Sequence, residues 1–222
     1  MHGKLRLQLP LWIMLLLGSV APAREMGLDP SRLPREGRSL DDFTRYGWVA
    51  ATLDNGDLND DGIPDIAAIL TQPPSKPDNG AESQRILLVL ISSANGTFLP
   101  GVSDGGLLVC VHCGGVKESA GVNIKKGILV VSQLTGSREF TDQTWRFRYE
   151  ATTRRFALIG QDVRTGDSAL GTGKKESYNF LTGVKISERY RYDRKRDREI
   201  TRSSKKEKIP KRVRFLGDTG NE

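Results

Sequence analysis

Short apolar runs and alternating apolar–polar stretches follow one another along this chain, with turn residues between them. Residues 85–92 (RILLVLIS) form a continuous apolar run, typical of a strand buried on both faces. In residues 145–149 aromatic side chains alternate with arginines, which predicts a half-buried strand. Base-stacking platforms show the same alternation, but a half-buried strand already explains it. The expected strands are 46–53, 66–70, 85–92, 107–111, 128–134, 144–150, 156–163 and 183–192. No convincing helical period exceeds about ten residues, so we expect an all-β chain.

A loop between the first two expected strands carries oxygen side chains at alternating positions. Ca²⁺ binds six to eight oxygens in a flexible shell, and short Asp and Asn side chains allow one tight loop to surround it. Gly62 supplies the sharp turn at loop position 6. The same residue types dominate ordinary turns without metal, but their regular spacing favours the metal. We therefore predict a Ca²⁺ site that stabilises the fold, with the carbonyl of Ile63 as backbone ligand and the side chains of Asp57, Asn59, Asp61 and Asp65.

At residues 56–70 the sequence resembles the FG-GAP and VCBS-type calcium loops of integrin-like β-propeller blades. These loops have the pattern Gly-Asp-Leu-Asn-x-Asp-Gly-x-x-Asp followed by an apolar strand. A propeller needs at least four blades, and only one such loop occurs in this sequence. The resemblance thus implies a single blade-like antiparallel β-domain with a calcium-binding loop.

The first 23 residues have the pattern of an export signal. Lys4 and Arg6 precede an apolar core at 9–17, and small residues at 21–23 suit cleavage. An N-terminal membrane anchor is the alternative, although this apolar core is short for a bilayer span. We expect a periplasmic protein without a membrane span after cleavage, with secretion from the cell as the alternative. The remaining 199 residues suit one domain with a substantial core.

We divide the mature chain into a flexible lead-in at 24–42, a β-domain at 43–192 and a basic C-terminal segment at 193–222. Residues 184–214 contain 14 Lys and Arg against 5 Asp and Glu, a net charge of +9. Such a cluster attracts anionic polymers, acidic proteins or membrane surfaces. The plainer alternative is that these charges keep an edge strand soluble and prevent it from pairing with another chain. We expect no nucleic-acid partner in the periplasm.

Cys110 and Cys113 are the only cysteines. In a flat strand, residues three apart lie about 10 Å apart on opposite faces, beyond the reach of a disulfide. The following Gly114-Gly115 permits a turn, and export favours oxidation. We therefore predict a local disulfide, because these cysteines and His112 supply too few ligands for a zinc site.

No catalytic constellation emerges from the sequence, and we expect a protein that is not an enzyme. The mature chain has one histidine, His112, and its carboxylates gather at the calcium loop. General acid–base catalysis needs a positioned histidine or a tuned carboxylate pair. The Gly- and Ser-rich segment 164–178 is expected to be a long loop between strands. Loops of this size are often functional, and a plain hairpin connection is the alternative.

Size, export signal, calcium loop and the block 177–183 (SYNFLTG) together resemble a bacterial periplasmic group of single-blade FG-GAP-like proteins. Some are immunity proteins used in bacterial competition, which inhibit lysozyme-like peptidoglycan hydrolase effectors. The resemblance implies a lysozyme inhibitor whose loop enters the hydrolase cleft with Ser168 and Tyr178. Lys174 and Lys175 are then positioned to face the hydrolase's two carboxylates. The alternative is a secreted calcium-dependent adhesion or carbohydrate-binding module.

Overall fold

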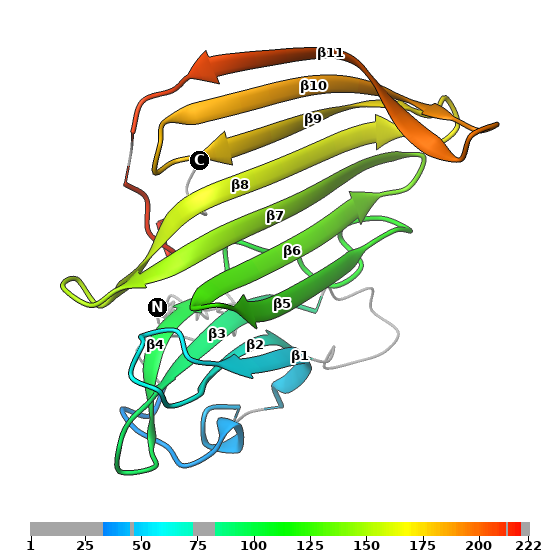
Figure 1. Ribbon diagram of the computed structural model, residues 1–222. Coiled ribbons are helices and arrows are strands. Elements are labelled where there is room, and N and C mark those ends of the chain that lie inside the picture. The colour runs from blue at the N-terminus through cyan, green and yellow to red at the C-terminus, as the bar shows by residue number, and fades with distance from the viewer. Residues whose placement is uncertain (1–32, 45–46, 73–82, 212, 219–222) are drawn as a thin grey trace, which may run out of the picture.

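The computed structural model describes residues 33–44, 47–72, 83–211 and 213–218, and its strands form two antiparallel sheets (Figure 1). The smaller sheet has the strand order β1 (Val49–Gly56), β2 (Asp65–Thr71), β3 (Arg85–Ser92), β4 (Phe98–Asp104). The larger sheet has the order β11 (Arg198–Lys208), β10 (Val184–Asp193), β9 (Thr172–Asn179), β8 (Arg155–Asp167), β7 (Glu139–Glu150), β6 (Ile128–Gly136), β5 (Ser119–Lys125). The prediction of an all-β antiparallel chain is confirmed. Four strands also make one propeller blade, and the calcium-type loop connects β1 to β2 of the smaller sheet.

Strands β2 and β3 are the centre of the fold because both of their faces are buried. On one face Ile69 and Val89 pack against the larger sheet, and on the other Leu70 and Leu88 belong to a second apolar cluster. This explains why residues 85–92 are apolar without interruption, since a strand covered on both sides has no wet face.

The described part of the expected lead-in is packed against the fold. Gly37 pairs with Phe98 of β4, and a short 3₁₀ turn, Leu40–Asp42, follows it. Phe43, 1% exposed, then covers the second cluster together with Trp48. The prediction of a flexible segment therefore does not hold for residues 33–42, because the outer face of the small sheet needs this cover.

The inner face of the larger sheet is apolar near the small sheet and polar further along its long strands. Near the small sheet, its inner face carries Phe147 of β7, which is fully buried, and Trp145. Further along β7 the same face carries Gln143 and Thr141, as register with β6 and β8 requires. Strands β9–β11 extend away from the small sheet (Figure 1). The core thus covers only one end of the larger sheet, and the inner face beyond it is polar.

Three side chains tie the sheets together through backbone N–H groups or charge. Asp54 of β1 accepts a hydrogen bond from the N–H of Ile124 in β5 at 2.8 Å. Asp104 of β4 accepts one from the N–H of Gly217 at 2.9 Å. Arg85 of β3 pairs with Glu118, the residue before β5, at 2.5 Å. Each contact joins segments distant in sequence.

The C-terminal segment expected as separate from residue 193 onward continues the fold. Strand β11 pairs with β10 along its length. The chain then returns to β8, where Phe215 bridges Ala157 and Leu216 enters the main core at 3% exposure. A boundary at residue 192 is therefore wrong for the described residues: the basic segment supplies an edge strand and part of the core.

Another expected strand is absent, since residues 107–111 form a loop with one isolated bridge at Val111. Leu107 and Leu108 are buried there without belonging to a sheet. Asp104 holds the start of this loop by accepting the N–H groups of Gly106 and Leu107. The run is apolar because it packs into the core, and burial alone does not make a strand.

Among the described residues, no helix is long and apolar enough to cross a membrane. The segment 1–23, for which we predict a signal peptide, lies outside the described residues.

Candidate binding surface and calcium loop

The loop between β1 and β2 is organised by its own carboxylates. Asp57 accepts hydrogen bonds from the N–H groups of Asp60 at 2.7 Å and Gly62 at 2.8 Å. These bonds, the one from Gly62 foremost, lower the pKa of Asp57. Asp61 accepts the N–H of Ile63 at 2.8 Å. Gly62 has a φ of 82°, a left-handed conformation that glycine adopts without strain. The loop is therefore held in one shape by short-range bonds.

Asp65 anchors this loop from the first position of β2. It is fully buried, and its two oxygens accept the N–H groups of Leu58 and Ser92, each at 2.8 Å. Burial raises the pKa of Asp65, and the negative charges of Asp61 and Asp57 raise it further. Asp65 is therefore close enough to Asp57 and Asp61 for their charges to act on it.

The donor set partly fits a calcium ion. Oxygen ligands of the kind that Ca²⁺ prefers are gathered in one loop, with Asn59 donating to Asp61 at 2.9 Å. However, no three or more His, Cys, Asp or Glu side chains among the described residues form a metal-ligating group. Binding would require the side chains of Asp57, Asn59 and Asp61 to turn towards a common centre, so the calcium site stays a prediction.

The expected long loop at 164–178 is a tight hairpin instead. Strands β8 and β9 pair from Asp167 and Thr172 onward, leaving a turn at residues 168–171. Tyr178 pairs with Gln161, six residues along β9 from Thr172, which places it about 20 Å from the turn. The four predicted partner-binding residues therefore do not share one loop.

Three of those four residues lie on β9, on two different faces. Lys174 and Tyr178 share the inner face, and Lys175 lies on the outer face. Lys174 pairs with Glu176 at 2.8 Å, while Lys175 pairs with Glu199.

The surroundings of Tyr178 and of Glu199 are filled by neighbouring side chains. The ammonium of Lys185 lies 4.9 Å from the ring centroid of Tyr178. A hydrogen bond with Glu176 raises the pKa of Lys185. Burial alone would raise the pKa of Glu199, but hydrogen bonds from Lys175 and Arg164 keep it below its usual value. These residues are therefore largely engaged within the sheet.

Ser168, the fourth residue, lies in the hairpin turn, and its hydroxyl is occupied. It donates to the carbonyl of Arg138 and accepts from the ammonium of Lys117, both at 2.6 Å. Asp167 closes the same turn by accepting the N–H groups of Ala169 and Leu170. The N–H of Leu170 is the main cause that lowers the pKa of Asp167. Ser168 thus braces the turn rather than presenting a free hydroxyl.

Leu170 projects from this braced turn and is 63% exposed. The β10–β11 turn lies beside it, with Arg194 donating to the carbonyl of Ala169 at 2.7 Å. Lys195 and Arg196 follow in that turn, and both are exposed. We call Leu170 and residues 194–196 the distal tip; both turns lie at the right of Figure 1. Sequence analysis missed this tip, although an apolar residue inside a polar turn was a usable signal.

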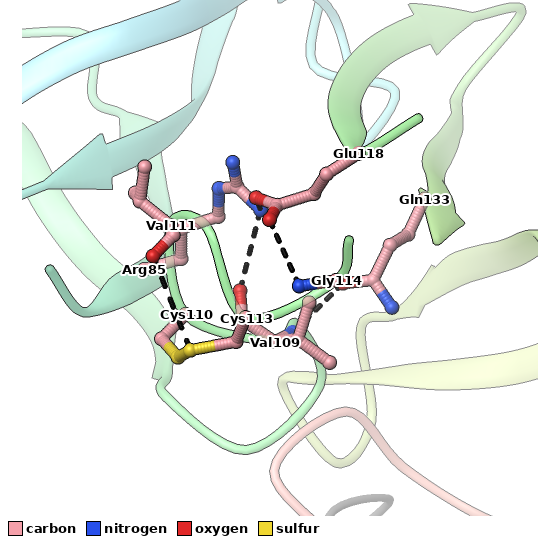
Figure 2. Close-up of a disulfide and its surroundings, with 8 residues drawn as sticks. All are labelled: Arg85, Val109, Cys110, Val111, Cys113, Gly114, Glu118 and Gln133. Atoms are coloured by element: carbon pink, nitrogen blue, oxygen red, sulfur yellow. Dashed lines mark hydrogen bonds and ion pairs between the residues drawn. A yellow bond between two sulfur atoms is a disulfide. The ribbon is translucent and has the colours of Figure 1, made fainter. Parts of the chain in front are cut away.

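Cys110 and Cys113 are joined in a disulfide, with their Cα atoms 5.3 Å apart (Figure 2). Beside them, Arg85 donates to the carbonyl of Val109 at 3.3 Å, and Glu118 accepts the N–H of Gly114 at 2.9 Å. The loop that carries the disulfide is therefore hydrogen-bonded to both partners of the Arg85–Glu118 ion pair, which joins the two sheets.

Comparison with protein-family models, with curated proteins and with solved structures gave no match.

Proposed function

We propose that this chain is a non-catalytic exported inhibitor of a lysozyme-like peptidoglycan hydrolase, acting as an immunity protein in the periplasm. The observation that carries this proposal is the distal tip. An exposed apolar residue on a rigid turn is a suitable anchor for a cleft, since a rigid group loses little conformational freedom on binding. Leu170 meets this description because hydrogen bonds on both sides hold its turn.

Charge supports the same assignment. Glycosidases of the lysozyme type hold two carboxyl groups at the scissile bond, so their clefts attract cations. Arg194 and Lys195 line the same surface hollow as Leu170 and bring positive charge to it, while Arg196 of the same turn pairs with Asp193 at 3.9 Å. The anchor enters the cleft in this proposal, and the basic residues meet its acidic walls. Tyr178 lies about 20 Å along β9 from the turn, so it is not part of the same anchor, and Lys174 is engaged by Glu176.

Replacing Leu170 by alanine is expected to weaken inhibition about thirtyfold, because truncating a central anchor commonly costs about 2 kcal/mol. The measurement is the clearing of a peptidoglycan suspension by a lysozyme-like peptidoglycan hydrolase, with inhibitor titrated in. Leu181→Ala is the matched control. Leu181 is 50% exposed in the β9–β10 turn, at the opposite end of β9, and its loss should leave inhibition unchanged.

Two results would contradict this proposal in different ways. If the wild-type protein leaves clearing untouched at large molar excess, the inhibitor function is wrong. If Leu170→Ala and Leu181→Ala inhibit equally well, the protein inhibits through a surface other than the distal tip.

We also propose that the β1–β2 loop binds one Ca²⁺ through the carbonyl of Ile63 and the side chains of Asp57, Asn59, Asp61 and Asp65. The ion would supply positive charge among three carboxylates, which otherwise repel each other. Its role here is structural, because the loop lies in the small sheet and the distal tip in the larger one.

Calcium at about 100 times its dissociation constant is expected to stabilise the fold by about 2.7 kcal/mol. For a chain of this size the melting temperature then rises by roughly 5–11 °C. Asp61→Ala should abolish the rise and the heat of calcium binding in titration calorimetry. Asp60→Asn is the control, because Asp60 is exposed and has a φ of 63° that asparagine tolerates. Equal melting curves in calcium and in chelator would refute the site.

A further inference from the structure

An open groove of 820 Å³ lies across β6–β11, beyond the end of the core. Its side chains come mainly from the inner face, as the pairing of Thr141 with Thr165 and of Thr165 with Lys174 shows. Phe140 and Tyr190 also border it, but the register places their rings on the outer face, where Arg164 lies over both. The groove is therefore lined by hydroxyl-bearing and charged side chains over a glycine-containing floor, with carbon atoms supplying most of its exposed surface.

Three arginines dominate the charge of this groove. Arg189 and Arg191 project from β10 two residues apart, and Arg202 projects from β11. All three are exposed, and within the described part of the chain none of them forms an ion pair. Of the acidic residues in the lining, Asp167 already pairs with Arg138 at 2.9 Å, which leaves Glu139. The groove thus offers three guanidinium groups without intramolecular counter-ions.

We propose that this groove binds an acidic oligosaccharide, a linear chain of sugars that carry carboxylate or sulfate groups. Guanidinium groups make paired, charge-assisted hydrogen bonds with such anions. The hydroxyls of Thr141 and Thr165 make no hydrogen bond within the described residues and can pair with sugar hydroxyls. The groove is open along the sheet, so a linear ligand enters from the side.

The shape and chemistry of the groove do not suit a peptide or a nucleic acid. A peptide strand adds to the edge of a sheet, and an amphipathic helix needs a row of large apolar side chains, whereas strands β6–β10 are paired on both sides and their inner-face side chains here are mainly Thr, Lys and Arg. Single-stranded nucleic acids stack their bases on aromatic rings, and the rings of Phe140 and Tyr190 face the other side. An acidic sugar chain needs neither feature.

Fluorescence anisotropy with labelled oligogalacturonate and labelled sulfated dextran oligosaccharide tests the inference at about 150 mM salt, where long-range attraction is screened. The wild-type chain should bind at least one of them and should not bind neutral dextran. The stronger of the two arms identifies the anionic group. Arg189→Ser should weaken binding about tenfold, as expected for the loss of a charge-assisted hydrogen-bonding group, and Arg189→Ser/Arg202→Ser should weaken it further.

Arg148→Ser is the matched control for Arg189→Ser. Arg148 is an exposed strand arginine on the outer face of β7, and its loss removes the same charge. Binding of this variant should stay within about twofold of wild type. Equal losses in both variants would show attraction by net charge alone and overturn the inference. So would tighter binding of polyglutamate or oligodeoxythymidylate of equal charge, or no binding of either acidic sugar. The groove requires no hydrolase, so this test is independent of the inhibitor function.

Discussion

Glu118→Ala is expected to lower the free energy of unfolding by about 3–5 kcal/mol, because it leaves the guanidinium of Arg85 buried without its partner. The side chains of Arg85 and Glu118 are only 10% and 7% exposed. The change also removes the acceptor of the Gly114 N–H. Since domains of this kind are stable by about 5–15 kcal/mol, the loss is a large part of the total. Urea denaturation followed by tryptophan fluorescence measures it, with Trp48 and Trp145 buried as reporters.

Two further variants separate this ion pair from a general effect of charge. Replacing both partners, as Arg85→Met/Glu118→Leu, should recover most of the stability, because apolar residues of similar size avoid the buried charge. Asp162→Ala breaks the pair of Asp162 with Arg146, whose side chains are 43% and 40% exposed, and should cost less than about 1 kcal/mol. If Glu118→Ala costs no more than Asp162→Ala, the buried pair does not join the sheets.

The sequence predicts strands well where one or both faces are buried. Residues 85–92 were expected as a strand, and β3 has those bounds. Strands β4, β5, β9 and β11 were missed. In β9 and β11 most side chains are exposed or half-exposed on both faces, so they show no apolar alternation. Contacts between distant residues hold them in the sheet, such as Lys185 with Glu176 at 2.6 Å and Arg164 with Glu199 at 2.5 Å. Such pairings depend on the register, which local sequence does not encode.

The candidate site shows the same limit. The Gly and Ser content of 164–178 indicated a long loop, yet β8 continues to Asp167 and β9 begins at Thr172. Gly166 and Gly173 lie opposite each other in the sheet. A Cβ on Gly173 would come within 2.5 Å of the Tyr190 ring, so only glycine fits at this position. These glycines therefore make room for an aromatic side chain across the sheet. From sequence, the glycines of this segment indicated a loop. In the structure, Gly166 and Gly173 are needed for close packing against the Tyr190 ring.

Asp65→Ala, measured in the presence of chelator, is expected to lower the free energy of unfolding by about 3–4 kcal/mol. Asp65 is fully buried, and its removal leaves the N–H groups of Leu58 and Ser92 without acceptors. An unsatisfied buried donor costs about 1–3 kcal/mol, and the change removes two acceptors at once. The affected groups join the calcium-type loop to the end of β3, so the loop should also become more accessible to hydrogen exchange.

Asp65→Asn removes the charge but keeps one of the two acceptors in the same assay. Its NH2 group then faces a backbone N–H donor, so at least half of the destabilisation should remain. Because chelator removes calcium from every sample, a loss of stability under these conditions does not come from lost metal binding. If Asp65→Ala and the wild type unfold at the same urea concentration in chelator, the carboxylate does not anchor the loop, and its burial must then serve the metal site instead.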